Sequence, residues 1–361
     1  MAVTSLIQRQ QALQAWAAAQ LAECGPGNLV GDIVAVSGDA SFRRYFRGIT
    51  ATTSVVLVDA PPDRENSQPF IDVDRRLLAA GVRVPQVMAA DLAQGFMALE
   101  DFGNELLWPA LEQQRLAGEY TAALALYQQC FDELLLIQRA DTERLPAYDD
   151  ALLLREMRLF SEWFCAGLLQ HPLTDSEQQL VEQAFALLSR SARQQTQVFV
   201  HRDYHSRNLM LLPAGGIGVI DFQDAVLGPV TYDLVSLLKD CYIEWPRAQV
   251  RAWAVAFAQQ AQARGILPAI SSEQFLADFD LMGAQRHIKV LGIFSRLWLR
   301  DGKSGYLKDL PLTFRYFQQV VMEEPSLAEF AGWLEAVIWP LLLPAIERAK
   351  AVAAQGSRVQ T

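Results

Sequence analysis

The stretch that decides the fold is His201-Arg202-Asp203-Tyr204-His205-Ser206-Arg207-Asn208, followed by Gly218-Val219-Ile220-Asp221. The first eight residues have the pattern H-x-D-x-x-x-x-N, and the second group is a short apolar run that ends in a carboxylate. Residues 197–200 are typical of a β-strand, and residues 209–212 and 217–220 are typical of two more, joined by a turn at 214–216. The sequence therefore predicts a strand, a loop and a β-hairpin that ends in an aspartate.

Three side chains of this stretch have the chemistry that phosphoryl transfer requires. Asp203 can orient an attacking hydroxyl and accept its proton, while Asn208 and Asp221 can hold Mg²⁺ on the phosphates of a nucleotide. Mg²⁺ prefers hard oxygen ligands and takes few of them from protein, because phosphates and waters fill the other positions. A lone H-x-D is common, so the hypothesis depends on the predicted strands around it. The sequence predicts ATP and Mg²⁺ as cofactors.

The residues after the hairpin carry a resemblance to a known family. Asp221 to Pro229 read DFQDAVLGP, and Tyr232-Asp233-Leu234 follow. This run resembles the signature of the aminoglycoside phosphotransferase family of small-molecule kinases, whereas protein kinases carry D-F-G at its start. The resemblance implies an α+β, bilobal protein-kinase-like fold. It places a small, sheet-rich nucleotide-binding lobe in residues 1–102 and a larger helical catalytic and sugar-binding lobe in residues 103–361.

Two further short stretches of sequence point to one group within this family. Residues 58–62 read VDAPP and residues 98–103 read ALEDFG. With them the chain resembles the bacterial N-acetylmuramate/N-acetylglucosamine anomeric kinases of cell-wall recycling. That resemblance implies ATP-dependent phosphorylation of the C1 hydroxyl of the two sugars in peptidoglycan recycling. Two alternatives stay open: a kinase of the same fold acting on an aminoglycoside, choline or homoserine, and a nucleotide-binding pseudokinase.

Hydrophobic periodicity predicts the elements of both lobes. The N-terminal part is expected to hold a helix over 5–23, strands over 33–36, 42–49, 54–58 and 96–99, and a helix over 70–80. Helices are expected in the C-terminal part over 117–140, 151–169, 175–195, around 232, and over 246–264, 272–300 and 312–350.

The nucleotide side departs from the kinase pattern, because the chain has no lysine before Lys239. Val58 and Asp59 stand where a lysine on the third strand is expected. Arg43 and Arg44 are the nearest candidates to replace it, since a guanidinium can bind phosphate oxygens bidentately. Gly38 and Ser41 could lie over the phosphates, although a Gly-Asp turn between strands is usually only a hairpin. By resemblance, the linker residues Leu99, Glu100 and Phe102 bind the adenine.

The acceptor side is predicted in a basic segment. Residues 281–316 carry seven basic and two acidic residues in a chain of net charge −10. Helical spacing places Arg286, Lys289, Arg296 and Arg300 on one face. A solvated basic stripe is the plainer interpretation, but apolar residues share that face. The stripe disfavours a cationic acceptor and suits the carboxylate of N-acetylmuramate. The further substrate candidates are His205, Arg207, Asp224 and His287.

Composition limits the other functions. The acidic net charge argues against general nucleic-acid binding. The four cysteines (Cys24, Cys130, Cys165 and Cys241) form no C-x-x-C pair and are expected to be reduced thiols. Residues 337–346 are apolar but too short to cross a membrane, and no signal peptide is recognisable. We expect a cytoplasmic protein whose partners are ATP and an amino sugar, with no obligate protein partner.

Overall fold

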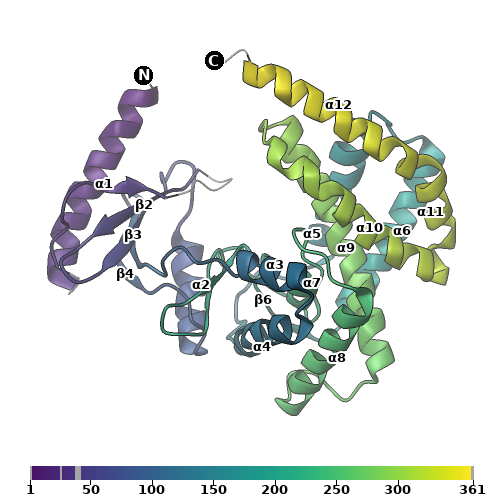
Figure 1. Ribbon diagram of the computed structural model, residues 1–361, viewed down its shortest axis with the longest axis horizontal. Helices are drawn as coiled ribbons and strands as arrows, with labels where there is room; N and C mark the ends of the chain where they lie inside the picture. Colours follow the sequence, from purple (N-terminus) through teal and green to yellow (C-terminus); the bar gives the residue numbers. More distant parts are fainter. Residues whose placement is uncertain (1, 25–26, 37–41, 359–361) are drawn as a thin grey trace. The chain divides into compact units, whose positions relative to one another are not determined.

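The computed structural model describes residues 2–24, 27–36 and 42–358. The chain divides into two compact units, one holding residues 1–107 and 207–225 and the other holding residues 108–206 and 226–361 (Figure 1). The first unit therefore extends beyond the predicted division at residue 102, and it also contains the hairpin that follows the H-x-D motif. The two units are described in turn.

The first unit is built on a five-stranded antiparallel sheet with the order β1-β2-β3-β5-β4. The expected strands are present as β1 (Val34–Ala35), β2 (Arg44–Ile49), β3 (Ser54–Asp59) and β5 (Phe96–Glu100). The edge strand β4 (Val87–Asp91) was not predicted. Its side chains are mostly half-buried on both faces, so the period-2 alternation that identifies a strand is weak there.

Helix α1 (Ala2–Cys24) covers one face of this sheet (Figure 1). Leu13, Ala17 and Leu21 recur at helical spacing and are fully buried against a cluster that includes Phe46 and Leu57. Alternation along each strand puts every second side chain on this face. The other side of the sheet carries the remaining side chains, those of the even-numbered residues of β3 and the odd-numbered residues of β2.

Helix α2 (Gln68–Ala79) and a β-hairpin complete the first unit. Phe70 of α2 packs on Phe222, with ring centroids 4.8 Å apart. The hairpin pairs β7 (Leu209–Leu211) with β8 (Ile217–Val219), as the sequence predicted. Its turn contains Gly215 and Gly216 with φ of 86° and 89°, a conformation that glycine adopts without steric cost.

The second unit is mostly helical. It contains an antiparallel strand pair, β6 (Gln197–Val200) with β9 (Val226–Pro229), and the H-x-D motif and the hairpin lie between these two strands in the sequence. Helix α3 (Leu107–Ala117) was not predicted. The expected helices up to residue 300 are present with small shifts of their ends. They are α4 (Tyr120–Ile137), α5 (Asp150–Leu159) continued by a π-helix (Phe160–Leu168), α6 (Asp175–Gln194), α7 (Tyr232–Leu238), α8 (Arg247–Ala263) and α9 (Ser272–Leu299).

Helix α9 lies at the centre of the second unit and contacts α5, α6, α7, α8 and α10. It begins at Ser271, whose side chain accepts a hydrogen bond from the Gln274 backbone N–H. Most of its residues are buried, including two of its cations, Arg286 and Lys289, which are 4% and 6% exposed. The plainer interpretation of a solvated basic stripe is therefore wrong for this half of the helix.

The predicted helix over 312–350 is several helices. Helix α10 (Leu310–Glu323) ends before Pro325, and α11 (Ala328–Trp333), a π-helical turn (Leu334–Ile338) and α12 (Trp339–Arg358) follow. Within the described residues, one helical stretch, Pro325–Gln355, is long and apolar enough to cross a membrane. A single stretch of this kind is weak evidence for a membrane span, because a core helix of a folded protein can have the same length and composition. Trp339 stacks on Phe314 of α10 at 5.3 Å, as in the core of a folded unit.

Candidate active site

Asp233 fixes the start of the H-x-D loop in the second unit. Its Oδ2 accepts a hydrogen bond from the His201 backbone N–H at 2.7 Å, and its Oδ1 accepts one from the Arg202 backbone N–H at 2.9 Å. Arg202 has φ of 77°, a strained conformation for a residue with a long side chain. The two hydrogen bonds stabilise this turn, after which the chain continues to Asp203. Asp233 thus braces the catalytic loop from the first turn of α7.

The burial of Asp233 affects its protonation. The side chain is 1% exposed. Burial raises its pKa to about 7, and the nearby Asp203 adds to this, while the two backbone N–H donors and Arg286 act in the opposite direction. Both oxygens accept hydrogen bonds well in the ionised form, whereas in the neutral form one oxygen carries the proton and accepts only weakly. The brace is therefore complete above this pKa.

A cluster of buried charges surrounds Asp203. Arg202 and Lys289 both pair with Glu156 on α5; Lys289 Nζ lies 3.1 Å from Glu156 Oε1. Lys289 also donates a hydrogen bond to the Tyr232 hydroxyl at 3.0 Å, and the Tyr148 hydroxyl donates one to Glu156. Each buried charge thus has a partner, as burial in a low-dielectric interior requires.

These cations set the charge state of Asp203. Burial by itself would raise the pKa of the Asp203 carboxyl, but the positive charges of Lys289, Arg202 and Arg286, with His205, outweigh burial and lower it. Asp203 is therefore a carboxylate at neutral pH. A carboxylate can accept a hydrogen bond from an acceptor hydroxyl and take its proton as the new bond forms.

The second half of the loop is held by the segment after α7. Asp240 accepts hydrogen bonds from both the backbone N–H and the hydroxyl of Ser206. The His205 ring lies edge-on to the ring of Tyr242, with centroids 5.5 Å apart. The loop is thus fixed from both ends of α7, by Asp233 in its first turn and by Asp240 just after its last residue.

The two predicted metal ligands lie together in the first unit. Asn208 Nδ2 donates a hydrogen bond to Asp221 Oδ2 at 3.1 Å, and Gln223 Nε2 donates one to Asp221 Oδ1 at 2.8 Å. The Ile220 backbone N–H donates to the Asn208 carbonyl at 3.1 Å, which holds the two chain segments in register. Asp221 has φ of 65°, so the strand ends there in a sharp turn.

The chemistry of this donor set fits Mg²⁺. It offers one carboxylate and one amide, which are hard oxygen ligands, and no group of three or more His, Cys, Asp or Glu that could hold a metal is present among the described residues. A site with two protein ligands suits an ion that takes its remaining ligands from phosphates and water.

Comparison with known proteins identifies the family. Residues 32–271 match the phosphotransferase enzyme family, whose short name is APH. The chain belongs to this family. The N-acetylmuramate/N-acetylglucosamine kinase of Pseudomonas putida is 43% identical to this phosphotransferase over 327 residues, covering 89% of this chain and 94% of that protein. The kinase of the same name from Neisseria meningitidis is 41% identical over 309 residues, covering 85% and 91%.

Solved structures support the fold of this phosphotransferase. An ethanolamine kinase of Plasmodium vivax has a TM-score of 0.58 at 10% identity, covering 79% of this chain and 81% of that one. The choline kinase LicA of Streptococcus pneumoniae has a TM-score of 0.56 at 11% identity, covering 85% and 99%. At these identities the likeness concerns the fold alone. The predicted protein-kinase-like fold, with an N-terminal sheet and a mostly helical C-terminal part, is confirmed.

The structure describes two of the four predicted phosphate-binding residues of the phosphotransferase. Gly38 and Ser41 lie outside the described residues. Arg43 is 7% exposed, with Nη2 3.6 Å from a Glu65 carboxylate oxygen. Arg44 shares the α1 face of β2 with Phe46, and its Nε donates to Asp59 Oδ2 at 3.0 Å. The structure thus gives Arg44 a carboxylate partner on the face of the sheet that α1 covers.

The linker of the phosphotransferase is held by two arginines that the sequence analysis missed. Arg47 of β2 donates to Asp101 Oδ1 at 2.9 Å. Arg83 donates to Glu100 Oε2 at 2.7 Å, which lowers the pKa of that carboxyl, and its guanidinium lies over the Phe102 ring at 4.6 Å. No motif marks either arginine. Leu99 and Phe102 are buried and Glu100 is half-buried, and the contact of this linker with adenine stays a prediction from the resemblance.

The four predicted acceptor residues on α9 have different surroundings. Arg286 is buried, and its Nη1 lies 3.6 Å from Cys241 Sγ. His287 is fully buried; its Nε2 lies 3.0 Å from the Lys239 carbonyl, and its ring stacks on Tyr316. Arg296 is half-buried, and Arg300 is exposed and bonded to Asp301. Of the other predicted substrate residues, Arg207 is half-buried and Asp224 is exposed.

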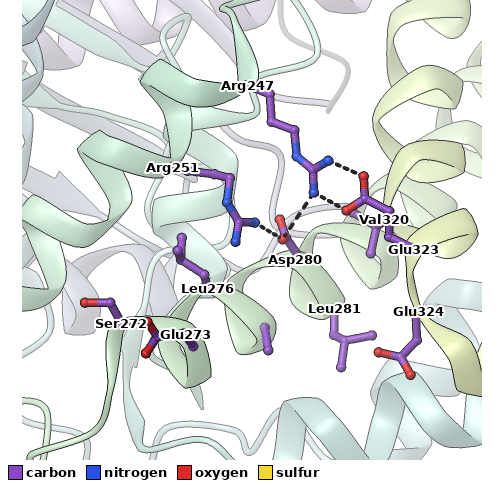
Figure 2. A pocket seen from close by; sticks show the side chains of 11 residues that line it. Arg247, Arg251, Ser272, Glu273, Leu276, Asp280, Leu281, Val320, Glu323 and Glu324 are labelled. Carbon is purple, nitrogen blue, oxygen red and sulfur yellow. Dashed lines mark hydrogen bonds and ion pairs between the residues drawn. The ribbon is translucent and has the colours of Figure 1, made fainter.

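A cavity of about 400 Å³ lies among α8, α9 and α10 (Figure 2). Arg251 pairs there with Asp280 at 2.6 Å, and Arg247 pairs with Glu323. Glu273 and Glu324 also line the cavity, so its lining is acidic overall. Since none of the candidate catalytic residues lines it, we assign this cavity no part in phosphoryl transfer.

Proposed function

We propose that this phosphotransferase uses ATP to phosphorylate the anomeric C1 hydroxyl of N-acetylmuramate and N-acetylglucosamine, giving the sugar 1-phosphates. Relatives at 41–43% identity carry the name of kinases of these two sugars and are matched over nearly their whole length. The observation that carries the chemistry is Asp203, which stands at the motif position of a kinase base and is kept ionised by the positive charges of Lys289, His205, Arg202 and Arg286.

In the proposed reaction, the acceptor oxygen forms a bond to the γ-phosphorus of ATP. The bond from that phosphorus to the bridging oxygen breaks, ADP leaves, and the acceptor proton passes to Asp203. The loop that carries Asp203 is fixed by Asp233 and Asp240, so the carboxylate needs little reorganisation when the substrate binds. Fixed geometry and charge supply most of the catalysis in this class of reaction.

Asn208 and Asp221 would hold the Mg²⁺ that accompanies ATP. When bound, the ion neutralises charge on the phosphate oxygens. Gln223 orients Asp221 by donating to one carboxylate oxygen. The nucleotide itself is proposed to be ATP, since a related aminoglycoside phosphotransferase, APH(2'')-Ib, was solved with ADP bound.

The names of the relatives, kinases of N-acetylmuramate and N-acetylglucosamine, support an acceptor that is anionic or neutral. The charged groups around Asp203 nearly balance, because Arg202, Arg286 and Lys289 lie among the carboxylates Glu156, Asp233 and Asp240. We place the activity in the cytoplasm, where ATP is available, and in the recycling of peptidoglycan sugars.

The test is ATP turnover with Mg²⁺ against N-acetylmuramate, N-acetylglucosamine, glucose, choline and kanamycin. The phosphorylated position is located by ³¹P–¹H correlation NMR. We expect turnover of the two N-acetyl sugars, with phosphorus coupled to the anomeric proton. Phosphate on any other carbon would overturn the C1 assignment. Turnover of choline or kanamycin alone would favour another kinase of the fold, and ATP binding without turnover would favour a pseudokinase.

A further inference from the structure

We propose that Arg296 binds the carboxylate of an acidic acceptor, so that this one side chain decides how well the enzyme uses a sugar with an acidic substituent relative to a neutral one. The inference rests on the proposed function and names the group that recognises the lactyl carboxylate of N-acetylmuramate. The sequence offered three arginines of α9 for this role, and their surroundings separate them.

Arg286 and Arg300 are less suited to this role. The Nε of Arg286 is also buried without a hydrogen-bond partner among the described residues, but the side chain is only 4% exposed, so a substrate carboxylate has little access to it. Arg286 also acts electrostatically on Asp203 and Asp240. Arg300 is 55% exposed in its side chain and donates two hydrogen bonds to Asp301, at 2.7 and 2.9 Å. A carboxylate ligand at Arg300 would have to displace this partner in water, where an ion pair gains little.

Arg296 is half-buried, and its Nε is buried without a hydrogen-bond partner among the described residues. Asp301, the carboxylate that acts on it electrostatically, is bonded by Arg300 instead. A buried donor without a partner costs free energy until a ligand supplies an acceptor. A carboxylate matches the forked donors of a guanidinium and satisfies Nε together with a terminal nitrogen.

The position of Arg296 on α9 relates it to the catalytic cluster. It follows Lys289 by seven residues, so the two side chains leave the helix within about 20° of each other and about 10 Å apart along the axis. Lys289 contacts Glu156 and acts on Asp203. Helix α9 therefore presents one cation beside the catalytic carboxylate and a second one about two turns further along. That spacing suits a single sugar ring with an acidic side group.

Ile293, on the same side of α9 as Lys289 and Arg296, is half-buried, so apolar and basic side chains share this face. Phe294 lies on the opposite face, where it packs on Tyr242 and on Tyr306 with centroids 6.2 and 5.0 Å apart.

The test compares kcat/KM for the two sugars in Arg296→Met and Arg296→Lys. We expect Arg296→Met to lose roughly 10- to 100-fold with N-acetylmuramate, the value of a charge-assisted hydrogen bond. Its loss with neutral N-acetylglucosamine should stay below about 3-fold. Arg296→Lys should recover part of the first loss, because it keeps the charge without the fork. The exposed Arg190→Met, on α6, is the matched control.

A substrate-side measurement keeps the test decisive if Arg296→Met folds poorly. The wild-type enzyme is assayed with the methyl ester of N-acetylmuramate, which lacks the negative charge. We expect the ester to lose as much as the Arg296 variant loses with the acid. Equal losses for both sugars, or the selective loss in Arg300→Met instead, would overturn the assignment to Arg296. Absence of wild-type turnover with both sugars would overturn the proposed function itself, and this inference with it.

Discussion

Lys289 on α9 and Glu156 on α5 form a buried ion pair, with Nζ 3.1 Å from Oε1, and the lysine acts electrostatically on Asp203, the proposed proton acceptor. Both side chains are less than a tenth exposed. Such a pair gives little net stability, since removing two charges from water offsets their attraction. The ion pair instead holds the lysine near Asp203, where it has the largest effect of the positive charges that lower the pKa of that carboxyl.

Replacing Lys289 with methionine should therefore change the pH dependence of catalysis. Without the lysine, burial is less well opposed and the pKa of Asp203 rises. The acid limb of the kcat/KM profile should then move to higher pH, with the largest loss of activity at the acid end of the profile. Lys289→Arg should retain most of the wild-type profile. The exposed Lys350→Met is the control, and an unshifted acid limb in Lys289→Met would contradict the positioning role.

Asp203→Asn should remove the proton acceptor while preserving the shape of the loop. We expect kcat to fall by about 10³-fold or more, because the amide cannot take the acceptor proton. ATP affinity, measured by titration calorimetry, should stay within a few-fold of wild type, since Asn208 and Asp221 are unchanged. A variant with near-normal turnover would show that another group accepts the proton.

Arg44→Ala separates the phosphate role suggested by the sequence from the structural role seen in the fold. Asp59 is fully buried and is bonded by both Arg9 and Arg44. Losing Arg44 should lower the free energy of unfolding by about 1–2 kcal/mol, because Arg9 remains as a partner. The Kd for ATP should change by less than about 3-fold. Asp59→Asn should reproduce the loss of stability. A large rise in the Kd with unchanged stability would restore the phosphate role.

The sequence predicted the site residues that lie in one continuous stretch, but it missed the ion pairs between residues far apart in the chain. Asp203, Asn208 and Asp221 were recognised because one continuous stretch carries them at fixed spacing between strands. The pairing of Arg9 with Asp59 joins residues 50 apart, and that of Arg202 with Glu156 joins residues 46 apart. No spacing rule links such positions. The fold brings them together only after α1 packs on the sheet and α5 packs beside the loop.

The basic face of α9 shows the same limit. Helical periodicity correctly placed Arg286 and Lys289 on one side, because 3.6 residues per turn is a local property. Whether that side meets water depends on the helices around it, and α9 is surrounded by five others. The sequence could therefore not tell which arginine has a partner.

Gly218→Ala tests the contact that holds the linker against the hairpin. A Cβ at this position would lie 2.5 Å from Cδ2 of Phe102, closer than atoms can pack. The ring must shift, which would also disturb the stacking of Arg83 on it. We expect a loss of about 1–3 kcal/mol in stability and weaker ATP binding. Gly332→Ala, where no atom lies within 4 Å of the added Cβ, is the control. Equal behaviour of the two variants would contradict the packing argument.

His287 should make the protein sensitive to acid. The side chain is fully buried, and burial lowers its pKa from 6.5 to about 3, with the charges of Arg286 and Lys239 adding to the effect. The unfolded chain takes up a proton on this residue below pH 6.5, whereas the folded protein resists it. Stability from this group is therefore complete above pH 6.5 and is lost as pH falls towards 3.

The expected size is about 1.4 kcal/mol for each pH unit below 6.5. The measurement is urea unfolding at pH 7.5, 6.5 and 5.5 for the wild type and for His287→Gln. The glutamine amide can still donate to the Lys239 carbonyl, which His287 Nε2 contacts at 3.0 Å, but it does not titrate. The variant should be less stable at pH 7.5, yet lose less stability between pH 6.5 and 5.5. If both proteins lose stability equally over that interval, the acid sensitivity comes from other groups, because a histidine that titrates alike in the folded and unfolded states contributes no slope.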